Sequence, residues 1–169
     1  MSADLVAGHR FPDLVLNDHA GNERRLSELT GDDPVLLQFY RGWWCPKEQA
    51  FFANLVALQP EAEVAYTRFV SVSVDPPEVQ AAFRAGIGAR WTFLSDSQRQ
   101  WIDELGLMET TESAQRPYLP TVFTLRPDLT IHTRYDGYWF WGRPTNEELR
   151  QDFRAISEIV RADWEPPRP

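Results

Sequence analysis

FYRGWWCPKEQ, residues 39–49, lies where a strand-like run of sequence meets a helix-like one. The residues PVLLQFY at 34–40 form a continuous apolar run without helical spacing, which predicts a buried β-strand. Pro46 favours the first turn of a helix, because an N–H at that position would have no partner within the helix. The only cysteine of the chain, Cys45, therefore lies at the predicted junction of a strand and a helix N-terminus.

The helix that follows Cys45 is expected to be amphipathic. Phe51, Leu55 and Leu58 recur at helical spacing, so one face of the helix is expected to be buried. Pro60 is expected to end this helix, because a proline in a helix interior removes a hydrogen bond and clashes with the preceding turn. The predicted helix covers residues 46–59.

The rest of the chain alternates between strand-like and helix-like segments. In chain order we expect a β-hairpin with a short helix (9–29), a buried strand (68–77), a helix with a proline start and a glycine stop (77–86), a short strand (91–96), a helix ending at Gly106 (97–107), a β-hairpin around the turn RPDLT (120–135), and a final helix with the capping box of Thr145 and Glu148 and an apolar side of Leu149, Phe153, Ile156 and Val160. This order predicts an α/β fold in which helices cover both faces of a mixed central β-sheet. We expect residues 1–169 to form a single domain with a short extended tail from about residue 163.

The composition excludes several classes of function. The formal net charge is -8 and Lys47 is the only lysine, so the concentrated basic face that binds nucleic acid is missing. A single cysteine allows neither an internal disulfide nor a CxxC dithiol, and the histidines are too far apart for metal-ligand spacing. We expect no metal and no cofactor. With no membrane-spanning apolar run and no secretory leader, we expect a cytoplasmic protein.

Several stretches together resemble the thioredoxin-like superfamily, and within it the AhpC/TSA, peroxiredoxin-like branch. FYRGWWCP (39–46) is very close to the FYRGxWCP motif of peroxiredoxin-like proteins, and GRPTNEELR (142–150) is similar to the stretch that opens their last helix. FPDLVLNDHAGNERRLSEL (11–29), VSVSVDPPEVQAAFRA (70–85) and WTFLSDSQRQWIDELGL (91–107) also resemble segments of the family. The resemblance covers nearly the whole chain and implies a thioredoxin-like fold with an N-terminal β-hairpin extension.

The same resemblance implies an antioxidant oxidoreductase with Cys45 as its redox-active cysteine. Arg143 aligns with an arginine that faces the reactive cysteine in peroxiredoxins, and Glu48 resembles the glutamate of their C-P-T-E. Gly42 departs from the pattern, because peroxiredoxins have there a Thr or Ser whose hydroxyl helps to hold the peroxide. Pro120 stands where they have a second arginine, and dithiol relatives have a second cysteine at the position of Glu48.

The position of Cys45 also favours a reactive thiol on physical grounds. Unpaired N–H groups and the macrodipole at a helix start favour a thiolate over a thiol. Arg41 and Arg143 would add positive charge near the sulfur, whereas an ionised Glu48 would oppose the thiolate, orient an arginine or relay a proton. The opposing interpretation is a small buried hydrophobe between neighbouring tryptophans, because free cysteines are among the most buried residues.

A substrate would be held by residues that flank Cys45 or that resemble the cis-proline segment of thioredoxins. These candidate substrate-binding residues are Tyr40, Gly42, Trp43, Trp44, Pro120 and Thr121. Pro120 is expected to form a cis peptide bond next to Cys45, so that its backbone can pair with a substrate. The aromatic stretch YWFW (138–141) is expected to belong to the core or to a subunit contact, and an exposed part of it would indicate an interface.

Three functions fit these observations. The first is a one-cysteine peroxidase that reduces hydrogen peroxide or organic hydroperoxides through a Cys45 sulfenic acid, with Arg143 and Arg41 stabilising charge and with an external thiol or a thioredoxin-type protein as reductant. The second is a monothiol-disulfide exchange protein. The third is a redox-inactive module that binds a partner through its aromatic surface. A homodimer is compatible with each of them.

Overall fold

The computed structural model describes residues 4–162. Its strands are β1 (Val15–Asp18), β2 (Glu23–Arg25), β3 (Val35–Phe39), β4 (Arg68–Ser73), β5 (Thr92–Ser95), β6 (Thr121–Leu125) and β7 (Ile131–Asp136). Its helices are α1 (Leu26–Leu29), α2 (Pro46–Val64), α3 (Pro77–Ile87), α4 (Gln100–Glu104) and α5 (Asn146–Val160). The order of strands and helices confirms the prediction, including the N-terminal hairpin of β1 and β2. The expected extended tail from about residue 163 lies outside the described residues.

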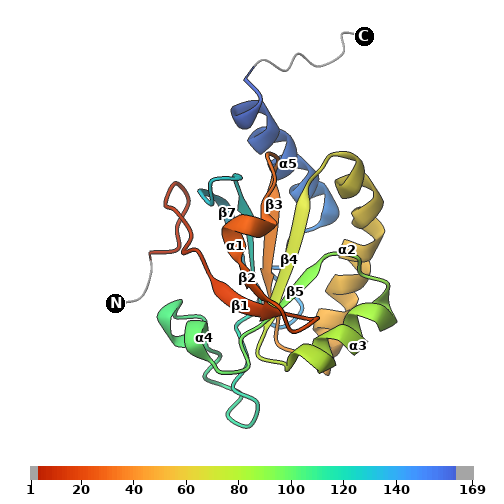
Figure 1. The fold of residues 1–169 in the computed structure, drawn as a ribbon, viewed down its shortest axis with the longest axis vertical. Coiled ribbons are helices and arrows are strands. Elements are labelled where there is room, and N and C mark those ends of the chain that lie inside the picture. The colour runs from red at the N-terminus through yellow and green to blue at the C-terminus, as the bar shows by residue number, and fades with distance from the viewer. Residues whose placement is uncertain (1–3, 163–169) are drawn as a thin grey trace.

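All described strands form one seven-stranded sheet in the order β2-β1-β5-β4-β3-β6-β7 (Figure 1). The interior strand β3 pairs in parallel with β4 and antiparallel with β6, so the sheet is mixed, as predicted. The hairpin of β6 and β7 completes one edge, and the hairpin of β1 and β2 completes the other. Because β3 lies in the interior of the sheet, its C-terminal end pairs with a strand on either side.

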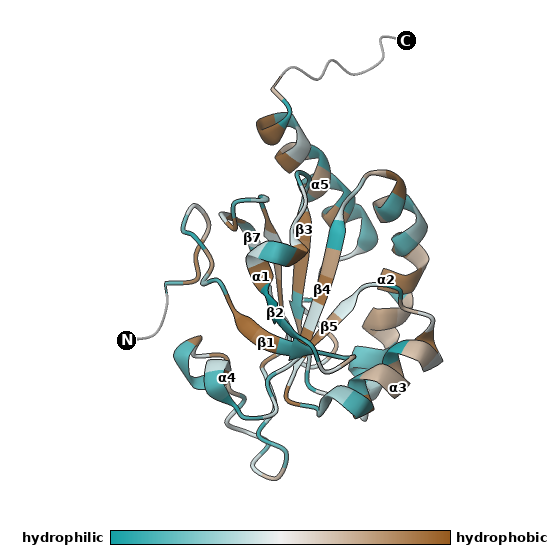
Figure 2. Cartoon of the chain, viewed as in Figure 1, coloured by the Kyte–Doolittle hydropathy of each residue, from teal (hydrophilic) through white to brown (hydrophobic). Residues whose placement is uncertain are grey.

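Two hydrophobic clusters cover the two faces of this sheet. On β3, Val35, Leu37 and Phe39 belong to one cluster and Leu36 to the other, as expected from the alternation of side chains along a strand. The first cluster includes residues of the N-terminal segment, α1 and α4, and the second includes residues of α2, α3 and α5. Figure 2 shows mostly apolar residues along β3 and β4 and a mixture of apolar and polar residues along the helices.

Helix α2 corrects the expectation that the helix would end before Pro60. It continues to Val64 with Pro60 inside it. Ala62, beyond the proline, is buried in the same cluster as Leu58. The packing of this extra turn against the core therefore outweighs the loss of the hydrogen bond that Pro60 cannot make. The helix therefore extends one further turn along the sheet.

Other boundaries also differ from the prediction, and the clearest cases are in α3 and α4. Helix α3 passes through Gly86 and stops at Gly88, which has the left-handed φ of 77° that glycine tolerates. Helix α4 begins at Gln100 rather than at residue 97, because the Asp96 carboxylate accepts hydrogen bonds from the N–H groups of Gln100, Trp101 and Ile102. None of the helices within residues 4–162 combines the length and the apolar character that a membrane span needs.

Candidate functional site

Cys45 lies between the end of β3 and the start of α2, as the sequence predicts. It is the N-cap residue of α2, with extended backbone angles, and Pro46 is the first helical residue. Its carbonyl accepts the N–H of Gln49 at 3.0 Å, which begins the helix. The side chain is 2% exposed, so the sulfur lies at the positive end of a long helix in a largely desolvated place.

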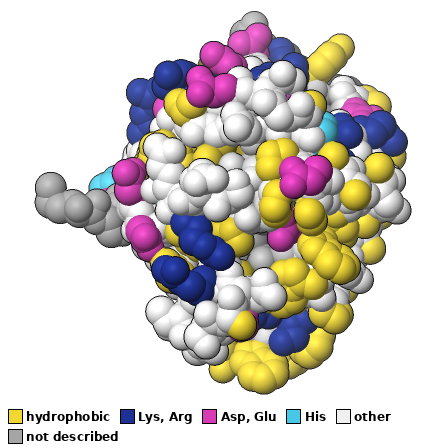
Figure 3. Space-filling model, turned by 60° about the horizontal axis from the view of Figure 1, so that its bottom comes forward, with side chains coloured by type: hydrophobic (Ala, Val, Ile, Leu, Met, Phe, Trp, Pro, Cys, Tyr) yellow, Lys and Arg dark blue, Asp and Glu magenta, His cyan; other side chains and the backbone are white. Residues whose placement is uncertain are grey.

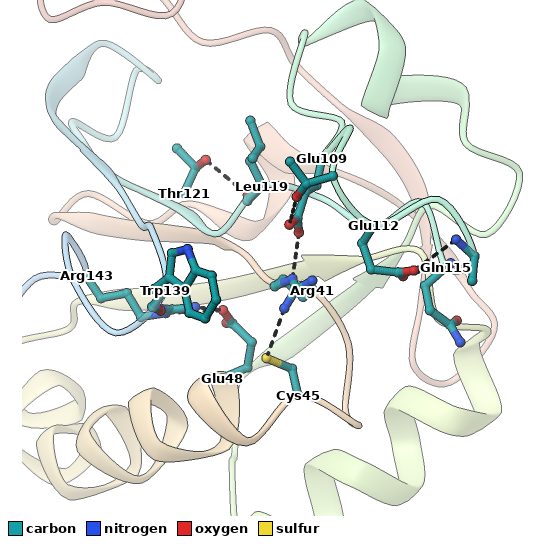
Figure 4. Close-up of polar contacts among 12 residues, drawn as sticks. Arg41, Cys45, Glu48, Glu109, Glu112, Gln115, Leu119, Thr121, Trp139 and Arg143 are labelled. Atoms are coloured by element: carbon teal, nitrogen blue, oxygen red, sulfur yellow. Dashed lines mark hydrogen bonds and ion pairs between the residues drawn. The ribbon is translucent and has the colours of Figure 1, made fainter.

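Arg41 is the charged residue that contacts the sulfur (Figure 4). Its Nη1 lies 3.7 Å from Cys45 Sγ, and its Nε donates to Glu109 Oε2 at 2.7 Å. Burial would lower the pKa of the Arg41 guanidinium, but Glu109 and Cys45 outweigh burial and raise that pKa. Arg41 is therefore a permanent positive charge that links the sulfur to a carboxylate.

Arg143 has different partners. Its Nε and Nη2 both donate to Glu48 Oε1, and its Nη1 donates to the Trp139 carbonyl at 2.6 Å. Glu48 is 1% exposed, and its burial raises the pKa of its carboxyl group, although Arg143 acts in the opposite direction. Of the roles considered for Glu48, orienting an arginine fits this geometry. Arg143 thus reaches the site, with its guanidinium bonded to Glu48 and the Trp139 carbonyl rather than to the sulfur.

Gly42 has a steric reason to be glycine. A Cβ built on it would collide with the indole of Trp44, and its φ of 153° lies in the range that other residues rarely adopt. The Trp44 ring in turn lies 5.1 Å from the Arg41 guanidinium carbon, in a cation–π contact. The indole thus fills the space into which a Thr or Ser side chain would extend.

Trp43 does not enclose the sulfur. Its side chain is 50% exposed, and its N–H donates to Asp75 Oδ2 at 3.2 Å. Burial raises the pKa of Asp75, while the hydrogen bonds from Trp43 and Ser73 act against that rise. Asp75 follows β4, so it ties the loop before Cys45 to the neighbouring strand.

A cavity of about 560 Å³ opens beside this cluster. Its lining includes Arg41, Lys47, Glu109, Pro120, Trp139 and Arg143. Of the predicted substrate-binding residues, Pro120 lines this cavity, whereas Tyr40, Gly42, Trp43, Trp44 and Thr121 do not. Tyr40 is buried in the core against Phe52, and Thr121 is fully buried in β6, where its hydroxyl donates to the Leu119 carbonyl.

The expectation of a cis peptide bond at Pro120 is wrong, since residues 4–162 contain no cis peptide bond. The Pro120 carbonyl instead accepts the N–H of Gly137 at 2.6 Å. That bond continues the pairing of the β6–β7 hairpin by one step, so the Pro120 carbonyl is already bonded to the segment that follows β7. Pro120 nevertheless lines the same cavity as Arg41 and Arg143.

The aromatic stretch 138–141 is not part of the core. Tyr138, Trp139, Phe140 and Trp141 are 70%, 59%, 71% and 73% exposed. Lys47 Nζ lies 4.2 Å from the ring centre of Trp139 and 4.8 Å from that of Phe140, which fastens the stretch to the start of α2. Figure 3 shows hydrophobic side chains gathered over part of the face that lies at the bottom of Figure 1.

Sequence reasoning did not find Glu109 or assign a place to Lys47. Glu109 follows the glycine-ended helix α4 by a few residues and matches no motif, so nothing local marks it. Lys47 lies inside the Cys45 motif, and the signal that was available is its position two residues after the cysteine.

Comparisons with known proteins show the family and the fold of this chain. The model of the AhpC/TSA family matches residues 7–134. A Mycobacterium tuberculosis protein named "Putative peroxiredoxin Rv1608c" is 33% identical over 130 residues, which cover 75% of this chain and 82% of that protein. "Thiol-disulfide oxidoreductase ResA" of Geobacillus thermodenitrificans is 24% identical over 153 residues, which cover 90% of this chain and 79% of that protein.

Solved structures show the same fold. Enterococcus faecalis AhpC matches with a TM-score of 0.77 at 16% identity and covers 99% of this chain and 100% of its own. Peroxidoxin BcpB from Mycobacterium tuberculosis matches with a TM-score of 0.75 at 23% identity and covers 91% of this chain and 97% of its own. The chain therefore has the α/β thioredoxin-like fold that the sequence predicts.

Proposed function

The chain belongs to the AhpC/TSA family, and from that premise we propose that it is a one-cysteine thiol peroxidase with Cys45 as its nucleophile. The observation that supports this proposal most is the Arg41 guanidinium 3.7 Å from Cys45 Sγ at the N-terminus of α2. Both the guanidinium and the helix start favour a thiolate there. The cavity lined by Arg41 and Arg143 is the place from which a peroxide would approach.

In the first step, the Cys45 thiolate attacks one oxygen of the hydroperoxide ROOH. An S–O bond forms while the O–O bond breaks, so the sulfur is oxidised to a sulfenic acid and the peroxide is reduced. The leaving RO⁻ takes up a proton and departs as water or an alcohol. Arg41, which contacts the sulfur, stabilises the negative charge as it moves from sulfur to the leaving oxygen.

Arg143 and Glu48 complete the charged surroundings of this step. Arg143 lines the same cavity as Arg41, and Glu48 fixes the orientation of its guanidinium. A donor that is already oriented stabilises developing charge without reorganising during the reaction. We assign Arg143 to the distal oxygen of the peroxide and Glu48 to holding Arg143 in place.

The second half of the cycle needs an external thiol, because the chain has one cysteine. A thiol condenses with the sulfenic acid to a mixed disulfide and water. A second thiol then releases Cys45 and leaves as the oxidised disulfide. A small thiol fits both steps better than a thioredoxin-type protein, because Cys45 is only 2% exposed.

A monothiol exchange function is the second candidate, and the relative named as a thiol-disulfide oxidoreductase favours it. In that case Cys45 would attack a disulfide rather than a peroxide. The 2% exposure of Cys45 argues against it, since a protein disulfide would have to reach a buried sulfur.

The test is mass spectrometry of the intact protein after an equimolar amount of hydrogen peroxide or cumene hydroperoxide, with a sulfenic-acid trap present. The expected result is one trap adduct on Cys45 and peroxide consumption with excess thiol that the Cys45→Ser variant lacks. A mixed disulfide with glutathione disulfide, without peroxide turnover, would select the exchange function instead. Peroxide consumption equal in both proteins would overturn the peroxidase proposal.

A further inference from the structure

We propose that Glu109 is a positioning residue of the Cys45 site, which holds the Arg41 guanidinium against the sulfur. This inference rests on the proposed function for its biological meaning, although its geometry and its test do not depend on peroxide turnover. It concerns a residue that carries no motif and lies far from Cys45 in the sequence. Its carboxylate acts through Arg41 and makes no contact with the reacting atoms.

The three groups form a chain of contacts. Glu109 Oε2 accepts from Arg41 Nε at 2.7 Å, and Arg41 Nη1 lies 3.7 Å from Cys45 Sγ. The two charged side chains are 17% and 16% exposed, so water screens their attraction less than that of a surface pair. Because a guanidinium is a rigid planar fork, fixing Nε also fixes the direction of Nη1 (Figure 4).

Glu109 is itself held from two sides. Its N–H donates to the Pro117 carbonyl at 2.9 Å, and its second oxygen accepts from the Thr111 hydroxyl at 2.7 Å. The neighbouring Met108 forms a bridge with Tyr118, whose buried hydroxyl donates to Asp96 at 2.6 Å. Both the backbone and the carboxylate of Glu109 are therefore held by hydrogen bonds. A residue that orients a site residue must itself be fixed in this way.

No other carboxylate of the described residues forms an ion pair with Arg41. Glu48 is bonded to Arg143, and Glu112, which lines the same cavity, accepts the N–H groups of Ala114 and Gln115. Without Glu109, Arg41 would keep the face of Trp44 and the weak contact with sulfur, but no ion pair with a described residue. A long side chain held by such contacts samples several rotamers.

Glu109 has two opposing influences on the thiolate, and they can be separated. Its negative charge near the site disfavours a second negative charge on sulfur. Its hydrogen bond to Arg41 holds a positive charge at the sulfur, which favours the thiolate. The effect through Arg41 is the larger of the two. Glu109→Gln removes the charge and keeps an acceptor for Arg41 Nε, whereas Glu109→Ala removes both.

The experiment follows the thiol-to-thiolate titration by NMR of ¹³Cβ-labelled cysteine, which gives one signal because the chain has one cysteine. This signal reports the sulfur even where reagents cannot reach it. Glu109→Ala is expected to raise the midpoint by about one pH unit, and Glu109→Gln to leave it within about 0.3 units. Glu112→Gln, the matched control with the same charge change at the same cavity, is expected to leave the midpoint unchanged.

A double-mutant cycle with Arg41→Ala decides whether Glu109 acts through Arg41. If it does, Glu109→Ala shifts the midpoint in the wild-type background and adds less than about 0.3 units in the Arg41→Ala background. Additive shifts, or a midpoint that falls in Glu109→Ala, would overturn the inference. A protein with the predicted cycle but no peroxide turnover would overturn the proposed function alone.

Discussion

Arg41 and Arg143 both line the same cavity, but they are held by different partners. Arg41 is bonded to Glu109 and contacts the sulfur, whereas Arg143 is bonded to Glu48 and to the Trp139 carbonyl. Each guanidinium therefore has its own carboxylate, and each carboxylate comes from a different part of the chain. This pairing keeps two positive charges close together in a place with little water, where unpaired charges would be costly.

At the same scale, Gly42 yields the first prediction. Gly42→Thr is expected to lower the free energy of unfolding by about 1–3 kcal/mol, because the new side chain meets Trp44 and a backbone with positive φ. Since it displaces Trp44 from Arg41, it should also lower, not raise, the rate with peroxide. Urea unfolding and stopped-flow kinetics measure the two effects.

The control is Gly86→Ala, because Gly86 lies within α3 and a Cβ there has open space. That change should stabilise the protein by about 0.5–1 kcal/mol. A Gly42→Thr protein that is as stable as wild type and faster with peroxide would contradict the steric account of this glycine.

At the scale of elements, α2 carries the site at one end and a strained position near the other. Cys45 and Pro46 form its start, where a proline costs nothing, and Pro60 lies in its interior, where a proline leaves the Val56 carbonyl without its usual partner. The helix continues because Ala62 and Leu58 pack on the sheet. The length of α2 is thus set by tertiary packing rather than by the strongest local stop signal.

Pro60→Ala is accordingly expected to stabilise the protein by about 1–3 kcal/mol, since it restores the hydrogen bond to Val56 and removes a clash. Loss of the stiff proline from the unfolded chain reduces this gain. Urea unfolding of the variant is the measurement. Pro77→Ala, at the first position of α3, is the control and should give no gain. Equal effects at both prolines would mean that α2 already relieves the strain at Pro60.

At the scale of the whole molecule, the site joins elements that are distant in the sequence. Cys45 and Glu48 come from the start of α2, Glu109 from the loop after α4, and Arg143 from the segment before α5. The sheet order brings these segments to one end of the molecule. Folding therefore buries an ionisable carboxyl, that of Glu48, and this burial must affect the stability of the entire fold.

Burial raises the pKa of Glu48 in the folded protein above its ordinary value near 4.5. At pH values between the ordinary pKa and the raised pKa, the folded protein therefore binds more protons than the unfolded chain. The contribution of Glu48 to the free energy of unfolding therefore falls as pH rises through this interval. The stability of wild type relative to Glu48→Gln should fall by at most about 1.4 kcal/mol per pH unit there. Urea unfolding at a series of pH values above 4.5 measures this difference.

Glu104→Gln, an exposed change on α4, is the control and should show no such trend. A wild type that gains stability over Glu48→Gln with rising pH would contradict the raised pKa. The same unfolding curves address the single domain, which stays a prediction: tryptophan fluorescence and circular dichroism should report one coincident transition.

The sequence by itself determined the order of strands and helices, the sheet class and the place of Cys45 at the start of α2. These features depend on local signals, namely apolar periodicity, a proline at the first helical position and a capping box, which act between residues close in the chain. The resemblance to the family added Arg143 and Glu48 as candidate site residues, and the structure pairs them with each other.

Only the tertiary structure decided which charges meet. Glu109 contacts Arg41 across 68 positions of sequence, and Arg143 contacts Glu48 across 95, so no local pattern records either pair. Tertiary packing also determines that α2 continues beyond Pro60 and that the aromatic residues 138–141 are exposed. It likewise places the Trp44 indole in the space beside Gly42. The physical reason is the same in each case: these outcomes depend on contacts that exist only once the sheet has brought distant segments together.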